Sequence, residues 1–303
     1  MPFQTTECQP ENMSGPIQSQ KKRVYYYFHQ HRIGDKVAIS AALKWYKEQH
    51  PQDWLIAVDD FWFENGKQRS IPSNIIFDEI VNECLYNTTP ADATRLDFGC
   101  IWIRVPWLAQ QGYYPSIKVS KECEEQMLSR FRWMCSPYVC VHILEDAPYN
   151  RGRNHNFTQM VQLMRFLSGN GMHVIRIGKS SGYFLKQQTD LTRLGLSVME
   201  SACIIKHSIA YIGGDTGMTH IASAVGVPWI LAIYGPPPNQ KPWRNHAKAI
   251  GCNVDFCSLP SVPKERRTVF YMHGHKFSLS KAMDTCVEHL FTSDAPLLRS
   301  KSP

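Results

Sequence analysis

The sequence predicts an α/β protein of two domains, each built on a parallel β-sheet. Three observations lead to this prediction. The chain has 303 residues, a length that favours two domains over one. Apolar strand patterns alternate with amphipathic helix patterns through the second half, and strict alternation is typical of a parallel sheet covered on both faces. The first half begins with the patterns of a strand, a helix and a strand.

The composition indicates an ordinary globular protein of enzyme size. Hydrophobic residues make up 43% and charged residues 19%, so the chain can bury a full core. No apolar run approaches the roughly 18 residues that cross a bilayer. Residues 1–22 are polar, so we expect a flexible tail there and neither a secretory signal nor a membrane span.

Charge and cysteine content narrow the function only a little. The net charge of +7 is spread over short groups, and its sign alone does not distinguish nucleic acid, anionic lipid and phosphorylated substrates. The ten cysteines include no CxxC pair and no Cys/His cluster at zinc spacing. We therefore expect reduced thiols, no bound metal and no cofactor.

The first domain is predicted to span residues 23–136, and the second residues 137–303. Residues 24–28 read as a strand, a helix follows with Ile39, Leu43 and Tyr46 on one face, and residues 54–58 form the next strand. Residues 59–98 allow no firm prediction. A strand is expected at 100–105 and a helix at 120–133, and Ser136 and Pro137 mark the boundary between the domains.

The second half is more regular. Its expected strands lie at residues 138–143, 173–177, 209–213 and 229–234. The apolar stripes of the intervening helices should face the sheet, and they comprise Phe157, Met160, Val161 and Met164 in one helix and Met218, Ile221, Ala222 and Val225 in another. A last helix should bury Leu279, Met283, Cys286 and Leu290.

The chemistry is expected where the strand at 209–212 ends. Glycines around Asp215 and Thr216 allow a sharp turn, and the helix that begins near Gly217 offers backbone N–H groups to an anion such as a diphosphate. His220 lies off the apolar stripe of this helix, so we expect it to face a cleft. For Asp215 alone, simple helix capping is an even alternative.

Two further segments are candidates. Gly34 and Asp35 open the first helix, which would place a carboxylate at the mouth of a cleft between the domains. Local evidence favours a capping role for Asp35, and the facing nucleotide site favours a functional one. The proline-rich loop at 235–243 serves equally well as the wall of a binding site or as a surface loop.

These segments, in this order, resemble the family 9 glycosyltransferases, the lipopolysaccharide heptosyltransferase group. Gly34, Asp35 and Val37 resemble the amino-terminal motif, and residues 138–178 resemble the strand, phosphate loop, helix and strand of that family. The most specific likeness, to the family signature, comprises Asp215, Thr216, Gly217, His220, Ala222, Ala224, Gly226, Pro228, Tyr234, Gly235 and Pro236.

The resemblance implies the GT-B architecture, in which two Rossmann-like domains face a cleft. It also implies an inverting, metal-independent transfer of a sugar from a nucleotide-sugar donor to a hydroxyl of a glycan or glycolipid acceptor. Asp35 would be the general base. The donor would be bound by Asp215, Thr216, Gly217 and His220, with Arg151 or Arg153 in place of the phosphate-binding lysine of the family. The implied location is the cytoplasm, with peripheral contact to a membrane.

Other functions remain open at this point. A GT-B sugar-nucleotide epimerase or hydrolase would use a similar donor site and would turn over without an acceptor. A degenerate nucleotide-sugar-binding protein would be insensitive to loss of Asp35. Nucleic-acid binding is disfavoured, because it needs a continuous basic groove with stacking aromatic residues and the sequence has only short basic groups.

Overall fold

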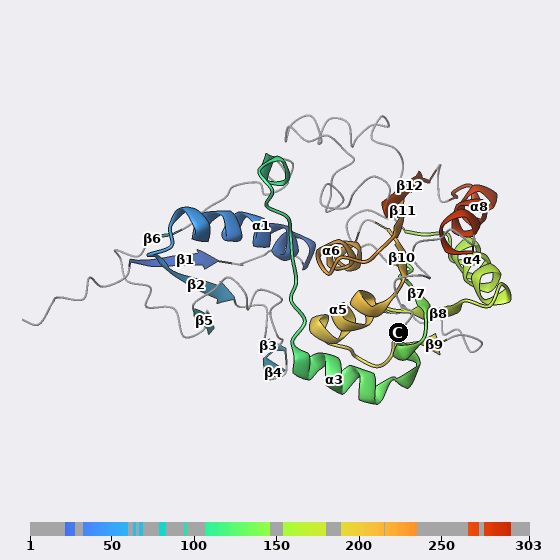
Figure 1. Cartoon of the computed structure of the whole chain (residues 1–303), viewed down its shortest axis with the longest axis horizontal. Coiled ribbons are helices and arrows are strands. Elements are labelled where there is room, and N and C mark those ends of the chain that lie inside the picture. The colour runs from blue at the N-terminus through green and yellow to red at the C-terminus, as the bar shows by residue number, and fades with distance from the viewer. Residues whose placement is uncertain are drawn as a thin grey trace, which may run out of the picture.

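The computed structural model describes residues 22–27, 33–59, 63–64, 67–68, 79–82, 94–95, 107–145, 154–179, 189–214, 216–234, 266–272 and 276–291. These residues form two parallel sheets with helices packed against them, together with a short antiparallel pair made of β3 (Phe63–Glu64) and β4 (Lys67–Gln68) (Figure 1). The predicted α/β fold class is confirmed.

The first sheet contains four parallel strands in the order β5-β2-β1-β6. Strands β1 (Arg23–Tyr27) and β2 (Trp54–Asp59) agree with the predicted strands. Strands β5 (Glu79–Asn82) and β6 (Thr94–Arg95) lie in the region that the sequence left undecided. The chain adds β2 and β5 on one side of β1 and β6 on the other, so the topological switch point of this sheet lies beside β1.

Helix α1 (Ile33–Gln49) covers one face of the first sheet. Ile39 and Leu43 of this helix are fully buried against Val24 of β1 and Leu55 of β2. Each such aliphatic side chain contributes about 1.5–3 kcal/mol on burial. The packing fixes the axis of α1, and it therefore fixes where the first turn of the helix points.

The second sheet contains six parallel strands in the order β12-β11-β10-β7-β8-β9. From β7 the chain builds β8 and β9 on one side and then returns to build β10, β11 and β12 on the other. The switch point therefore lies between β7 and β10, where an open parallel sheet binds its ligands. The strand bounds are Tyr138–Val141 (β7), His173–Arg176 (β8), Thr189–Asp190 (β9), Ala210–Gly213 (β10), Ile230–Tyr234 (β11) and Arg267–Tyr271 (β12).

Both faces of the second sheet are buried, as the alternating pattern predicted. Tyr138 and Cys140 of β7 belong to one apolar cluster, whereas Val139 and Val141 belong to the cluster on the opposite face. Helices α5 (Val198–His207) and α6 (Gly217–Ala224) contribute to the first cluster. Helices α4 (Phe157–Gly169) and α8 (Leu279–Leu290) contribute to the second. In Figure 1 they lie together on the face of the sheet opposite α5 and α6.

The predicted helix faces need two corrections. In α4 the buried residues are Met160, Leu163, Met164 and Leu167, so the stripe is rotated from the expected one and Phe157 and Val161 are only half-buried. In α8 the fully covered positions are Ala282, Cys286 and Leu290, while Leu279 and Met283 lie at the edge of the cluster. Each helix has more apolar residues than one buried face can hold, so periodicity alone does not predict which of them are buried. Packing against the twisted sheet decides it.

Helix α3 (Lys121–Arg130) and the 3₁₀ turn η2 (Arg132–Cys135) precede the second sheet. Met127 and Met134 are buried in the same cluster as Cys203 of α5, so this segment packs on the second sheet. The proposed boundary between residues 136 and 137 remains a prediction. The expected strand at 100–105 and most of the expected tail at 1–22 lie outside the described residues.

Helix α1 also packs against α6, which joins the two sheets. Val37 of α1 lies in the core cluster that contains Ile221 and Ala222 of α6. The backbone N–H of Ile117 donates to the carbonyl of Ala224 at 3.1 Å, and the N–H of Ser116 donates to Ser40 Oγ of α1 at 3.2 Å. The segment before α3 therefore binds both helices.

Two features of the described residues bear on the earlier expectations. Cys123, Cys135, Cys140, Cys203 and Cys286, the cysteines of the described part of the chain, are all free thiols. None of the described helices has the length and apolar character of a membrane span.

Candidate functional site

The turn after β10 depends on two glycines because side chains and backbone approach it closely. A Cβ atom on Gly213 would lie 2.5 Å from the hydroxyl oxygen of Tyr211. A Cβ atom on Gly214 would lie 2.5 Å from Nε2 of His155 and 3.0 Å from the carbonyl oxygen of Ile233. Such distances are well inside van der Waals contact, so larger residues would displace the turn.

Thr216 occupies the N-cap position of α6 and does not cap the helix. Its backbone is extended, with φ −144° and ψ 164°, and its side chain makes no capping hydrogen bond. The hydroxyl Oγ1 instead lies 3.2 Å from Nδ1 of His142, the residue that directly follows β7. This contact crosses the switch point of the second sheet.

His220 lies between the two sheets. The residue is only 4% exposed, so its ring is packed and not open to solvent. The ring instead lies against Gly34 in the first turn of α1, where a Cβ atom would be 2.6 Å from Cδ2 and 2.9 Å from Nε2 of the imidazole. Helical periodicity placed His220 off the apolar stripe of α6, but it could not show that the other half of the chain covers this side.

The remaining predicted site residues are described only in part. Gly217 begins α6, next to Thr216. The backbone of Asp35 belongs to the first turn of α1, directly after the glycine that contacts His220, and its side chain lies outside the description. Arg151, Arg153 and Asp215 lie outside the described residues, as does the loop at 235–243.

Comparison with known proteins shows a partial family match and a shared fold. Residues 191–268 match the model of glycosyltransferase family 9 (heptosyltransferase). The fold resembles E. coli ADP-heptose LPS heptosyltransferase II with a TM-score of 0.60 and 13% identity, over 93% of this chain and 100% of that one. The chain is therefore similar to the family 9 glycosyltransferases, in sequence over residues 191–268 and in fold over most of its length.

Two more structures share the fold of this glycosyltransferase-like protein. A family 9 glycosyl transferase from Veillonella parvula matches with a TM-score of 0.56 and 13% identity, over 91% of this chain and 93% of that one. E. coli heptosyltransferase WaaC with ADP matches with a TM-score of 0.51 and 12% identity, over 92% and 100%. The expected GT-B architecture is confirmed by these likenesses, and the family match supports a glycosyltransferase enzyme. No curated protein sequence matches the chain.

The family match covers the part of the glycosyltransferase-like protein that forms the β10 turn. Residues 191–268 include α5, β10, α6 and β11, and thus Thr216, Gly217 and His220. His142, which binds Thr216, lies outside the matched segment. Among the described residues, no group of three or more His, Cys, Asp or Glu side chains is arranged to hold a metal ion.

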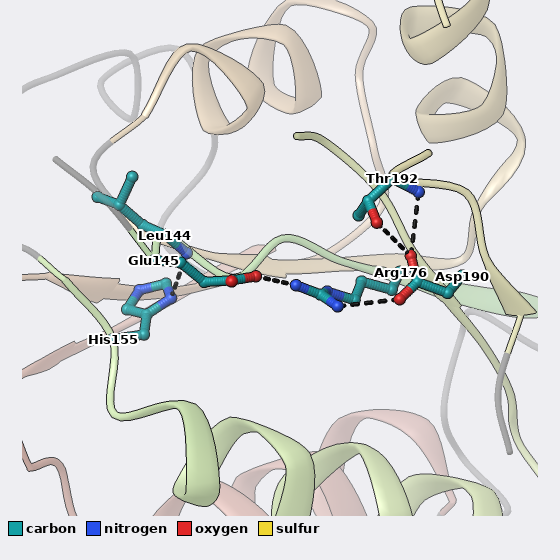
Figure 2. A network of polar contacts seen from close by, with 6 residues as sticks. All are labelled: Leu144, Glu145, His155, Arg176, Asp190 and Thr192. Atoms are coloured by element: carbon teal, nitrogen blue, oxygen red, sulfur yellow. Dashed lines mark hydrogen bonds and ion pairs between the residues drawn. The ribbon is translucent and has the colours of Figure 1, made fainter. Parts of the chain in front are cut away.

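A second buried histidine closes the base of the loop between β7 and α4. The backbone N–H of His155 donates to the carbonyl of Leu144 at 2.8 Å, and the N–H of Leu144 donates to Nδ1 of His155 at 3.1 Å (Figure 2). Because Nδ1 accepts, Nε2 must carry the proton of the neutral ring, and it donates to the carbonyl of Ile233 at 3.0 Å. The ring therefore has a single tautomer with both nitrogens satisfied.

The electrostatics keep His142 and His155 neutral. Burial lowers the pKa of His142 to about 3, with further lowering by the neighbouring His155 and Arg176. Burial also lowers the pKa of His155 to about 4, although its hydrogen bond to Ile233 acts in the opposite direction. Near neutral pH both rings are hydrogen-bonding groups without charge.

A buried ion-pair network links the carboxyl ends of β7, β8 and β9. Arg176, whose side chain is 1% exposed, donates to Asp190 at 2.9 Å and to Glu145 (Figure 2). The N–H of Thr192 donates to Asp190 at 3.0 Å, and its hydroxyl donates at 2.6 Å. Two buried carboxylates are thus compensated by one guanidinium and by the donors of Thr192.

Sequence reasoning missed His142, His155 and Arg176. A signal was present for His142 and Arg176, because both stand at the carboxyl end of an apolar parallel strand, where ligands bind. His155 lies directly before the N-cap residue Asn156 of α4. No pattern in the sequence pairs His142 with Thr216, because the two residues are distant along the chain.

Proposed function

We propose that this protein is an inverting, metal-independent glycosyltransferase that moves a sugar from a nucleotide-sugar donor to an acceptor hydroxyl. The contact between Gly34 and His220 is the observation that supports it most. It joins the start of α1, which follows the switch-point strand of the first sheet, to α6, which follows the switch-point strand of the second. The two segments with the predicted chemistry therefore adjoin each other.

The donor diphosphate is assigned to the turn after β10. Gly217 opens α6, and the positive end of the helix dipole stabilises an anion placed there. Asp215, Thr216 and His220 complete this half of the site, and Arg151 or Arg153 supplies a positive charge from the loop after β7. As the glycosidic bond breaks, negative charge grows on the departing diphosphate, and these groups stabilise it without a metal.

Asp35 is assigned the role of general base. It accepts the proton of the acceptor hydroxyl while the hydroxyl oxygen attacks the anomeric carbon from the face opposite the diphosphate. The new glycosidic bond therefore has the inverted configuration. The resemblance points to a glycan or glycolipid acceptor and to work at the cytoplasmic face of a membrane.

The donor is testable directly. ADP-heptose is the first probe because a structural neighbour is named for it, followed by ADP-, GDP-, UDP- and CDP-hexoses. A true donor raises the thermal midpoint of the protein, because it binds the folded state alone. Incubation with mixed glycan acceptors should then release nucleoside diphosphate, with NMR of the product showing an inverted anomer.

Three results would contradict the proposal. Release of nucleoside diphosphate that does not depend on any acceptor would indicate a hydrolase or epimerase. Binding of a nucleotide sugar with turnover that is unchanged by Asp35→Asn would remove that residue from the role of base. Addition of EDTA should leave the rate unchanged, and a loss that added metal restores would refute metal independence.

A further inference from the structure

His142 and Thr216 face each other across the switch point of the second sheet. His142 follows β7 and Thr216 follows β10, and these two strands are neighbours in the sheet. The backbone N–H of His142 donates to the carbonyl of Ile212 at 2.8 Å, which continues the pairing of the two strands to this level. The side-chain contact of 3.2 Å between Nδ1 and Oγ1 is thus set by the sheet itself.

The ring of His142 is held from the other side by Gly178. This glycine has φ +106°, a conformation that other residues rarely adopt. A Cβ atom there would lie 2.7 Å from Nε2 of the imidazole, so the ring is packed directly on the backbone. His142 is buried, and its ring has little freedom to turn away from Thr216.

Thr216 has the residue type and the position of a helix cap, but its hydroxyl is used elsewhere. An N-cap threonine ordinarily accepts a hydrogen bond from the backbone N–H of the second or third helical residue. Ser120, Asn156 and Ser197 cap α3, α4 and α5 in this way, whereas Ser278 leaves α8 without such a bond. At α6 the hydroxyl contacts His142 instead, and the Thr216 side chain also hydrogen-bonds the hydroxyl of Tyr211.

We propose that His142 is a positioning residue that holds the Thr216 hydroxyl away from the first turn of α6. The backbone N–H groups of Gly217 and Met218 then stay available to the diphosphate of the donor, whereas the N–H of Thr219 donates to the carbonyl of Thr216 at 3.1 Å. The inference rests on the proposed function, because it assumes that a diphosphate binds there. His142 touches Thr216 and not the substrate, so its effect on binding passes entirely through the threonine.

The expected loss of affinity follows from competition between the Thr216 hydroxyl and the diphosphate for the same backbone N–H groups. Without His142 the hydroxyl can rotate and cap α6, and such a cap is worth about 1 kcal/mol. A diphosphate must displace it, which lowers affinity about five- to tenfold. With the threonine hydroxyl removed as well, no competitor remains, and loss of His142 should then change the affinity less than about twofold.

The test uses the full chain and titration calorimetry with ADP, GDP, UDP and CDP, continuing with the one that binds the wild type. His142→Asn places an amide where Nδ1 stood and should bind like the wild type within about twofold. His142→Gln places its amide at the position of Nε2, and His142→Leu has no polar group. Both should weaken binding about five- to tenfold.

A double-mutant cycle separates positioning from a general loss of structure. The factor by which His142→Leu lowers nucleotide affinity is measured in the wild type and in the Thr216→Ala background. His173 provides the matched control, because its Nε2 lies 3.0 Å from Thr189 Oγ1 in a similar pair at the start of β8. His173→Leu should leave nucleotide affinity unchanged.

The outcomes are distinct. If no nucleoside diphosphate binds the wild type, the proposed function fails and the inference fails with it. If one binds but His142→Leu costs the same affinity with and without Thr216→Ala, the donor site stands and the positioning role of His142 is refuted. Equal affinities of His142→Asn and His142→Gln would refute it too, even where His142→Leu does not fold.

Discussion

The imidazole of His220 occupies the space that a side chain on Gly34 would need, at 2.6 Å from the ideal Cβ position to Cδ2. Glycine at this point of α1 is thus required by a residue of the other half of the chain. The contact brings the backbone next to Asp35 against the helix that carries the family signature. It links one predicted half of the active site to the other.

Gly34→Ala should damage activity although alanine favours helices. In an exposed helix, alanine in place of glycine stabilises by about 1 kcal/mol. Here the new methyl group must displace His220 or shift α1, and we expect at least a tenfold loss in kcat/KM together with a lower thermal midpoint. Gly169→Ala in α4 is the matched control, since nothing lies within 4 Å of its Cβ position, and it should not lower either quantity.

A second change in the same contact should relieve the first. His220→Ala removes the ring that a methyl group on Gly34 would meet, so the double variant Gly34→Ala/His220→Ala should be more stable than Gly34→Ala alone. Activity should stay low because His220 is assigned to the donor site. Thermal melting of the four proteins measures the coupling, and additive shifts would show that the two residues do not interact.

Asp35→Asn should separate binding from catalysis. The amide keeps the shape of the carboxylate but cannot accept the proton of the acceptor hydroxyl, so transfer should fall at least a hundredfold. Nucleotide-sugar affinity should remain within about threefold of the wild type, because the donor is assigned to the other domain. Rates and calorimetry on the same preparation check this, and a parallel loss of donor affinity would argue against the division of roles.

Removal of Arg176 should destabilise the fold strongly. Arg176→Met leaves Glu145 and Asp190 buried without their cation, a change that typically costs about 3–5 kcal/mol. Lys206→Ala breaks the exposed pair with Glu124 and should cost less than about 1 kcal/mol. Urea denaturation gives both values, and similar losses would mean that burial does not set the strength of these pairs.

Stability should fall as the pH drops below the ordinary pKa of histidine. His142 and His155 have folded-state pKa values of about 3 and about 4, below the 6.5 of a free side chain. Between these limits the unfolded chain binds more protons, so the free energy of unfolding declines with decreasing pH. Two such groups give a slope of up to about 2.7 kcal/mol per pH unit.

A substitution tests that source of acid sensitivity. His155→Gln keeps an amide near Ile233 and cannot take up a proton in this range, so the pH slope between about 6 and 4.5 should be roughly halved. Denaturation curves at several pH values check this. An unchanged slope would assign the acid sensitivity to other groups.

The sequence predicted most of the fold because strand and helix patterns are local. Strands β1, β2, β7, β8, β10 and β11 and helices α1, α4, α6 and α8 lie where the apolar patterns placed them. The two-residue strand β9 is too short to show a period, and β12 is only half-buried at every position. Neither has the run of buried apolar residues that marks an interior strand.

The site was predicted less completely, because its residues depend on contacts distant in sequence. The glycine-flanked turn and the first turn of α1 were found from local patterns. The burial of His220 was not, since it arises from α1. His142 and Arg176 stand at the ends of apolar strands, and their partners are distant in sequence: Thr216 is the N-cap residue of α6 and Asp190 lies in β9. Only the folded chain shows which buried polar group meets which.

The position of Val37 in the apolar cluster of α6 makes the two halves of this protein poor candidates for modular exchange. A chimera that took its first half from one relative and its second from another would set a foreign α1 against a native α6. The residues facing Val37 and Gly34 would then no longer match. Successful grafts should therefore transfer α1 and α6 together, with residues 116–119 that bind between them.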